Sequence, residues 1–282
     1  MLKFLYKKGY KNLNGLDILP EKKKSKYCDR IIGNIEKLPY KSSSFDLILL
    51  EQVFEHSVNP RKVLKEAFRV TKLNGKIVLG IPNAAKYSAS QLFPFYMIIM
   101  KEHIQHFDLQ HIKMLSRDLD AHVLETKETT YPLRSMNMPC SNLYIVLQKK
   151  KSIKKKLKNK FLLRTKMAKY LNQSNNKLNF IAKKLSRYSD RGKTIYFWGI
   201  GREFFLIYSM LKYKKKKIYK FIDSNKRIHK KKINGIEICD KSCLKKINQD
   251  NAVIVVTAVY HFLEIQKYLK NINFAGDIVK IF

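Results

Sequence analysis

Four polar residues in the N-terminal half each stand directly after an apolar run that predicts a β-strand: Asp17, Asn34, Glu51 and Gln52. In open α/β sheets, ligands bind beyond the carboxyl ends of the strands, so these side chains are candidates for ligand contact. A carboxylate such as that of Asp17 can accept hydrogen bonds from two ribose hydroxyls. The amide of Asn34 can pair with an adenine amino group, and Ile35 would then cover one face of the adenine ring.

A glycine pair in the C-terminal half predicts a second ligand site. Gly199 and Gly201 follow an apolar run and precede a helical pattern, as the first two glycines of a dinucleotide-binding turn do, although Phe204 occupies the third position. Asp223 stands 22 residues after Gly201, a suitable offset for an acid that binds ribose. Arg202, at the start of the helix, completes this candidate set. The alternative is that the glycines only permit a tight strand–helix turn.

Three histidines of the N-terminal half are the candidate proton acceptors: His56, His103 and His106. Imidazole titrates near neutral pH and could remove a proton from a reacting group. The alternative for each is a structural histidine held by hydrogen bonds. No metal site is expected, because the nearest cysteine pair has no second pair to complete a zinc site. The four cysteines are Cys28, Cys140, Cys239 and Cys243.

The elements that would position these residues follow an α/β pattern in two stretches. In the N-terminal stretch, apolar runs alternate with a helix that Asn59-Pro60 opens, which predicts a parallel sheet. The apolar segment around residues 91–100 contains a proline and is expected to form an exposed loop or lid. In the C-terminal stretch, strand and helix patterns alternate from TIYFWGIG to DIVKIF, which predicts a small doubly wound fold.

A basic connector separates the two stretches. Residues 149–191 are rich in lysine, and their apolar residues recur at helical spacing on both sides of the sequence NQSNN. This pattern predicts two amphipathic helices around a break. The expected domains are therefore 1–148, a helical linker at 149–191, and 192–282.

The N-terminal motifs resemble those of class I S-adenosylmethionine-dependent methyltransferases. GLDI, then the LP, FD, EH and RV-K landmarks, then NG before KIVLGIPN, occur in the order found in that family. The resemblance covers residues 9–83, and it implies a Rossmann-like fold with S-adenosylmethionine as cofactor. It also implies cofactor contacts from Asp17, Ile18, Asn34, Ile35, Glu51 and Gln52. Asn34 replaces the family's usual aspartate, and Asn74-Gly75 stands where the family often has two glycines.

The sequence departs from this family at its front. Residue 1 corresponds to the helix after the family's glycine-rich loop, so the family's first strand and that loop have no counterpart here. The loop normally brings backbone N–H groups to the methionine end of the cofactor. The C-terminal stretch resembles small Rossmann-like domains of bacterial surface-sugar enzymes, on its WG-G and FIDSN turns. Such domains occur after sugar methyltransferase domains.

Composition adds an unusual charge. The chain has 58 lysines and arginines against 22 acids, a net charge of +36. Base composition of the gene is one explanation, and attraction to anionic membranes, acidic polymers or nucleic acid is the other. The connector is thus a candidate for peripheral contact with an anionic membrane. No signal peptide or membrane span is evident, so we expect a cytoplasmic protein with reduced thiols.

Three functions follow from these observations. The first is a methyltransferase-type protein of cell-surface polysaccharide or nucleotide-sugar metabolism, with a small-molecule or sugar-linked acceptor. The second is a non-catalytic scaffold or nucleotide-ligand-binding protein at the membrane face. The third is nonspecific binding to nucleic acid through KKKSIKKKLKNK and KYKKKKIYKF, with Tyr213, Tyr219 and Phe221 between the lysines. No motif that reads a nucleic-acid sequence is present, so no specific nucleic acid is expected as a partner.

Overall fold

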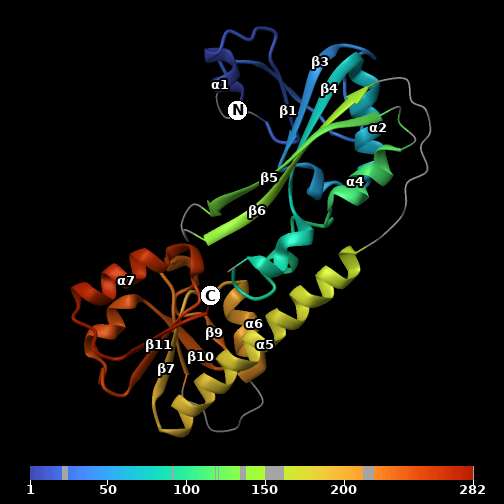
Figure 1. Ribbon diagram of the computed structural model, residues 1–282. Helices are drawn as coiled ribbons and strands as arrows, with labels where there is room; N and C mark the ends of the chain where they lie inside the picture. Colours follow the sequence, from blue (N-terminus) through green and yellow to red (C-terminus); the bar gives the residue numbers. More distant parts are fainter. Residues whose placement is uncertain are drawn as a thin grey trace. The chain divides into compact units, whose positions relative to one another are not determined.

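The chain folds into two compact units. The computed structural model describes residues 1–20, 25–90, 92–117, 119, 121–133, 138–149, 162–211 and 219–281 (Figure 1). The N-terminal unit contains Met1–Ala85, Lys101–Thr129 and Ser141–Leu163, and the C-terminal unit contains Lys86–Met100, Thr130–Cys140 and Arg164–Phe282. These units differ from the predicted domains, because Lys86–Met100 and most of the connector belong with the C-terminal residues.

The N-terminal unit begins with helix α1 (Leu2–Lys7) and a small parallel sheet. Strands β1 (Asn14–Asp17) and β2 (Asp29–Ile32) pair from Asn14 opposite Asp29 to Asp17 opposite Ile32. Both strands are four residues long, and every residue of β2 is exposed. This sheet therefore has little core of its own.

A second sheet carries most of the N-terminal unit. Its strand order is β3-β4-β6-β5, with β3 at Phe45–Glu51, β4 at Thr71–Pro82, β5 at Ala121–Leu133 and β6 at Met138–Lys149. Strands β3 and β4 are parallel as predicted, but β6 is antiparallel to β4. The predicted parallel pairing is thus confirmed for β3 and β4, and β6 makes the sheet mixed. Only four residues separate the end of β5 from the start of β6, too few for the crossover that a parallel pair would need. Within the described residues, β1 and β2 also form a sheet separate from β3.

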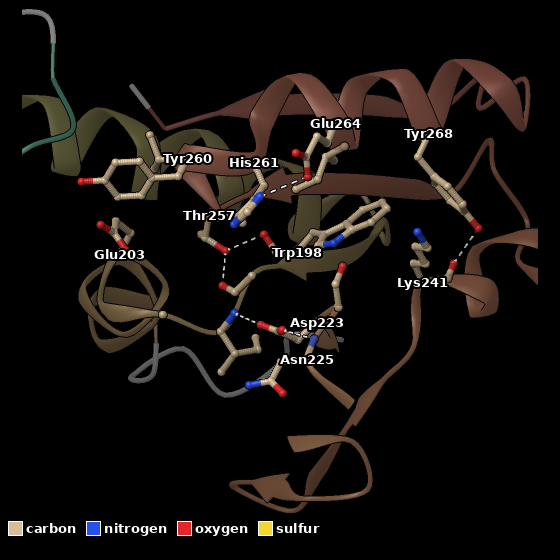
Figure 2. Close-up of a pocket in the computed structure, with 17 residues that line it drawn as sticks. Trp198, Glu203, Asp223, Asn225, Lys241, Thr257, Tyr260, His261, Glu264 and Tyr268 are labelled. Carbon is tan, nitrogen blue, oxygen red and sulfur yellow. Dashed lines mark hydrogen bonds and ion pairs between the residues drawn. The ribbon is translucent and has the colours of Figure 1, made fainter. Parts of the chain in front are cut away.

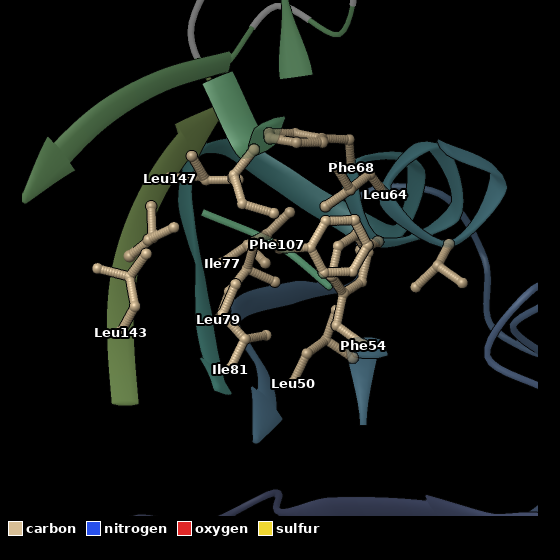
Figure 3. Close-up of a cluster of buried hydrophobic side chains, with 14 residues drawn as sticks. Leu50, Phe54, Leu64, Phe68, Ile77, Leu79, Ile81, Phe107, Leu143 and Leu147 are labelled. Atoms are coloured by element: carbon tan, nitrogen blue, oxygen red, sulfur yellow. The ribbon is translucent and has the colours of Figure 1, made fainter. Parts of the chain in front are cut away.

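Helix α2 (Pro60–Val70) covers this second sheet. Asn59 caps its N-terminus by accepting a hydrogen bond from the backbone nitrogen of Lys62 at 3.0 Å, and Pro60 occupies the first turn. Figure 3 shows Leu64 and Phe68 of this helix beside Ile77 of β4. Helix α4 (Leu109–Ser116) follows the segment that contains His106 and Phe107, and the short helix η1 (Phe54–His56) follows β3. These elements enclose one hydrophobic core.

The C-terminal unit has the predicted doubly wound sheet, in the order β12-β11-β7-β8-β10-β9. Its parallel strands are β7 (Thr194–Trp198), β8 (Tyr219–Ile222), β10 (Ile236–Cys239), β11 (Ala252–Val256) and β12 (Asp277–Lys280). Strand β9 (Lys232–Ile233) pairs with β10 in the antiparallel sense. Helices α6 (Arg202–Leu211) and α7 (Phe262–Asn271) follow β7 and β11. The short helices of this unit are η2 (Ala84–Ala89, which begins in the N-terminal unit), α3 (Tyr96–Ile99), η3 (Lys226–Ile228), η4 (Lys241–Lys246) and η5 (Val259–His261).

The connector is one helix where it is described, not two. Helix α5 spans Leu163–Asp190 and passes through NQSNN without a break. Ser174 lies inside the helix with only 5% of its surface exposed. Its neighbours Tyr170 and Leu178 are buried on the same face, so the apolar stripe continues through the polar sequence. Residues 150–161, in the first of the two predicted helices, lie outside the described residues, as do most of the lysines of KYKKKKIYKF.

The apolar segment before residue 100 is buried, contrary to the predicted exposed loop. Phe93, Tyr96 and Met97 each have 2% or less of their surface exposed. The hydroxyl of Tyr170 on α5 accepts a hydrogen bond from the backbone nitrogen of Met97 at 3.1 Å. The segment therefore packs on α5, which supplies the apolar surface that sequence inspection did not foresee. Among the helices described, none is both long enough and apolar enough to span a membrane.

Candidate functional site

Asp17 ends β1 with its carboxylate at the surface. Arg30 donates a hydrogen bond to its Oδ2 at 2.6 Å, and the backbone nitrogen of Leu19 donates to its Oδ1 at 3.1 Å. The Leu19 hydrogen bond and then the Arg30 guanidinium lower the pKa of this carboxyl group. Asp17 is therefore a stable anion with lone pairs open to solvent. Ile18, the next predicted contact, has 70% of its surface exposed.

A cavity of about 300 Å³ lies beside Asp17. Its walls include Leu2, Lys3, Tyr27 and Arg30. The anionic strand end with an aromatic and an aliphatic wall fits the adenosine half of S-adenosylmethionine.

Asn34 and Ile35 are held by the protein itself. The Asn34 side chain accepts a hydrogen bond from the backbone nitrogen of Glu36 at 2.8 Å, which closes a local turn. Ile35 packs against the hydrophobic core of the N-terminal unit. The Oδ1 atom of Asn34 is occupied by this turn. The predicted contact with adenine would therefore come from the Nδ2 atom of Asn34.

Glu51 and Gln52 lie at the end of β3, on the other sheet. The Tyr144 hydroxyl donates a hydrogen bond to Glu51 at 2.8 Å, and Gln52 donates to the Asn142 side chain at the same distance. Gln52 has a φ of 51°, and its nitrogen bonds the carbonyl of Gly80 at 2.8 Å. These bonds fix both side chains against β4 and β6. The six predicted cofactor contacts therefore divide between two sheets.

Two of the three predicted histidines lie together, with a residue that was not predicted. The ring centroids of His56 and His103 are 5.0 Å apart, and the Nε2 atom of His56 lies 4.0 Å from Glu55. Burial raises the pKa of Glu55 to about 7, and the nearby charge of Glu51 adds to this effect. Burial also lowers the pKa of His106. The one sequence signal for Glu55 was its place directly before His56.

The C-terminal unit has a larger pocket, of about 430 Å³, at the carboxyl ends of β7, β8 and β11 (Figure 2). Gly199, Gly201 and Asp223, three of the residues predicted for a second ligand site, all line it. Asp223 accepts a hydrogen bond from the backbone nitrogen of Ile200 at 2.7 Å and another from that of Asn225 at 2.8 Å. The carboxylate thus braces the glycine turn and the turn after β8.

The neighbours of this pocket explain two departures from the predicted set. Arg202 does not line the pocket, because its guanidinium pairs with Glu203 at 2.8 Å and lies over the ring of Tyr96. Phe204 occupies the position of the third glycine in the dinucleotide-binding pattern. Its side chain is fully buried in the core, where it stacks on Tyr208.

Sequence inspection missed the opposite wall. Thr257 is buried and donates a hydrogen bond to the Gly199 carbonyl at 2.6 Å. Lys241 lies over the ring of Tyr268, with its nitrogen 4.8 Å from the ring centroid. The pocket lining also contains the carboxylates of Glu203 and Glu264. With Asp223 they outnumber the single lysine, which favours hydroxyl-bearing ligand parts over phosphate.

Two family matches cover different parts of the chain. Residues 1–79 match the methyltransferase domain family, and residues 192–280 match the family described as C2185-like, N-terminal. The first match falls within the N-terminal unit and contains both strand-end acids. The second coincides with the doubly wound sheet of the C-terminal unit.

Two curated relatives are uncharacterized proteins of Methanocaldococcus jannaschii. The protein MJ1123 is 47% identical over 51 residues, which cover 18% of this chain and 25% of that protein. The protein MJ0638 is 33% identical over 87 residues, which cover 30% of this chain and 38% of that protein. The chain therefore matches well under half the length of either relative.

Solved structures give a weak likeness. A S-adenosylmethionine-dependent methyltransferase from Methanosarcina mazei is 18% identical, with a TM-score of 0.42, covering 53% of this chain and 87% of that one. A 1,6-didemethyltoxoflavin methyltransferase from Burkholderia thailandensis is 10% identical, with a TM-score of 0.41, covering 52% of this chain and 65% of that one. The family match of residues 1–79 supports a methyltransferase-type N-terminal unit with S-adenosylmethionine as its cofactor.

Proposed function

We propose that the N-terminal unit binds S-adenosylmethionine and that the chain acts in methyl transfer to sugar-linked acceptors of cell-surface polysaccharide or nucleotide-sugar metabolism. The observation that carries this proposal is the exposed carboxylate of Asp17 at the end of β1, beside a cavity and inside the segment that matches the methyltransferase family. Its lone pairs are available to the two hydroxyls of a ribose. The acceptor class rests on the sequence resemblance of the C-terminal unit to sugar-enzyme domains.

The residues of this chain would bind the cofactor, orient the acceptor and remove the proton of its hydroxyl group. Asp17 would hold the ribose, and the Asn34 amide nitrogen would approach the adenine. The cofactor supplies an electrophilic methyl group when bound, and the transfer itself is a displacement that depends on alignment. His56, His103 and His106 lie in segments that follow β3 or precede α4. One of these histidines would serve as the base that takes the proton of an acceptor hydroxyl.

A second candidate function is cofactor or nucleotide binding without catalysis. The separation of β1 and β2 from the β3 sheet favours it, because Asp17 and Glu51 then belong to different sheets. A methyltransferase needs both ends of its cofactor held with respect to the acceptor. A binding protein needs only the adenosine half.

Calorimetric titration with S-adenosylhomocysteine tests the first proposal without knowledge of the acceptor. We expect micromolar affinity in the wild type. Asp17→Asn should weaken it about tenfold or more, since a hydrogen bond to a charged group contributes about 1.5–3 kcal/mol.

Asp46→Asn is the matched control for this titration. Asp46 is also an exposed acid paired with a base, Lys72, but it lies at the start of β3. Equal affinity of the two variants, or no binding by the folded wild-type chain, would refute the assignment of Asp17. If binding is present but no methyl transfer occurs to any sugar acceptor, the second candidate function is correct.

For the C-terminal pocket, we propose a ribonucleoside-containing ligand whose ribose contacts Asp223. Titration with adenosine, uridine and their diphosphates tests it. Asp223→Asn should abolish the binding, whereas Asp240→Asn should not. Asp240 braces a turn in the same way, through a hydrogen bond from the Ser242 nitrogen at 2.9 Å, but does not line the pocket. Equal binding by both variants would contradict the proposal.

A further inference from the structure

Glu55, His56 and His103 bring three potential metal ligands together in the N-terminal unit. One carboxylate oxygen and one nitrogen from each imidazole all lie within 4.8 Å of one another. Ligand atoms around a tetrahedral zinc ion are about 3.4 Å apart, given bonds of about 2.0–2.1 Å. The side chain of His56 has 42% of its surface exposed, so a rotation of this ring can close the remaining distance.

The carboxylate of Glu55 lacks compensation within the protein. Glu55 has 1% of its surface exposed, and neither of its carboxylate oxygens has a hydrogen-bond partner among the described residues. The nearby basic groups are the rings of His56, whose Nε2 lies 4.0 Å from Glu55, and of His103. Burial of an unpaired carboxylate is costly, and proteins normally neutralise such a group with a cation or with hydrogen bonds. A glutamate in this position therefore needs an explanation beyond packing.

The backbone holds the cluster in place. The backbone nitrogen of Gln105 donates to the carbonyl of Glu55 at 3.1 Å, which ties the segment that carries His103 to η1. The ring centroids of Phe54 and Phe107 lie 4.8 Å apart, and both side chains belong to the hydrophobic core. Both segments are thus anchored in the hydrophobic core. Ligands on anchored segments lose little freedom when they bind an ion.

We propose that Glu55, His56 and His103 bind a divalent transition-metal ion. Two imidazoles and one carboxylate suit zinc, cobalt, manganese or iron(II), whereas magnesium and calcium prefer oxygen ligands alone. Three protein ligands leave at least one coordination position open. His56 is exposed, so the open position faces solvent near the end of β3. The ion could therefore hold an oxygen of a ligand and lower the pKa of a hydroxyl bound there.

Titration of the metal-free, tag-free chain with Co²⁺ tests this proposal. We expect visible absorption that saturates at one equivalent, and Zn²⁺ should displace it while excess Mg²⁺ should not. Glu55→Gln should weaken binding at least about tenfold, since even changes behind the ligands cost that much. His56→Ala is the second variant, because an exposed side chain can be removed without loss of folding. It should weaken binding to a similar degree.

The control variant is His261→Ala. His261 also pairs with a glutamate, Glu264, at 3.1 Å, but both side chains are exposed. This change should leave the Co²⁺ affinity unaltered. The proposal is overturned if the wild type shows no saturable absorption, or if Glu55→Gln and His56→Ala bind as tightly as the wild type. It is equally overturned if the spectrum carries thiolate-to-cobalt bands, which would place a cysteine among the ligands.

Discussion

Replacement of Gly199 by alanine should strongly destabilise the C-terminal unit. Gly199 has a φ of 106°, and an added Cβ would lie 2.5 Å from the backbone nitrogen of Ala258 and 2.7 Å from its Cα. These backbone atoms belong to the turn after β11 and have little freedom to shift. The unfavourable φ costs about 1–2 kcal/mol, and overpacking adds about 1–3 kcal/mol. Gly199→Ala should therefore lower the free energy of unfolding by about 2–5 kcal/mol.

Gly192→Ala separates the two contributions. Gly192 has a φ of 76°, and an added Cβ would meet nothing within 4 Å. This variant keeps the unfavourable φ and lacks the contact, so its expected loss is about 1–2 kcal/mol. The difference between the free energies of unfolding lost in the two variants measures the cost of placing a Cβ of residue 199 against Ala258.

Urea denaturation followed by tryptophan fluorescence is the assay. Trp198 is the single tryptophan of the sequence, and 2% of its surface is exposed in the core of the C-terminal unit. Its emission therefore reports this unit alone. With a urea dependence of about 1–3 kcal/mol per molar, Gly199→Ala should lower the midpoint by about 1 M or more, and Gly192→Ala by clearly less. Equal shifts in the two variants would refute the argument from Ala258.

Two further predictions concern the N-terminal unit and use circular dichroism during denaturation. In the folded protein the pKa of Glu55 is raised from 4.5 to about 7. In the presence of EDTA, the contribution of Glu55 to stability should therefore be largest below pH 4.5, where its carboxyl group is protonated in both the folded and the unfolded chain. The unit should lose up to about 3 kcal/mol as the pH rises through 7, and Glu55→Gln should remove that dependence. Arg69→Ala should cost about 2 kcal/mol, because Arg69 bonds Glu66 and two loop carbonyls at 2.8–3.0 Å. Lys72→Ala, which breaks only an exposed pair, should cost under about 1 kcal/mol.

Most strands and helices could be predicted because their apolar periods are strong. The run before Glu51 and the helix after Pro60 have the expected form. The hairpin of β9 and β10 was missed although Asn234-Gly235 marks its turn, with φ values of 49° and 81°. Its strands are too short for a visible period. The polar sequence NQSNN predicts a break in α5, but its residues, such as Ser174, lie inside the helix because tertiary contacts override their weak helix preference.

The site residues were less accessible to sequence reasoning, for two physical reasons. Gly199 and Asp223 could be assigned to one site because each follows a predicted strand, and parallel strands place their carboxyl ends at the same edge of the sheet. Sequence reasoning could not foresee that the Arg202 side chain pairs with its neighbour Glu203 and leaves the pocket. Nor could it identify Glu55, since a charged residue gives no sign in the sequence that it is buried. Side-chain direction and burial depend on packing between segments distant in sequence.

The division of the N-terminal sheet has a consequence for any ligand at Asp17. Strands β1 and β2 pair over four residues only, and Ile31 and Ile32 on β2 are exposed. A two-stranded sheet with so little buried apolar surface is marginally stable by itself. A ligand that binds Asp17 must therefore hold this sheet in order, and the entropy of that ordering is subtracted from its affinity. By contrast, the pocket around Asp223 lies on a sheet with five parallel strands, and β7 and β11 beside it are almost entirely buried. If both sites bind adenosine-type ligands with similar contacts, the C-terminal site should therefore be the tighter one.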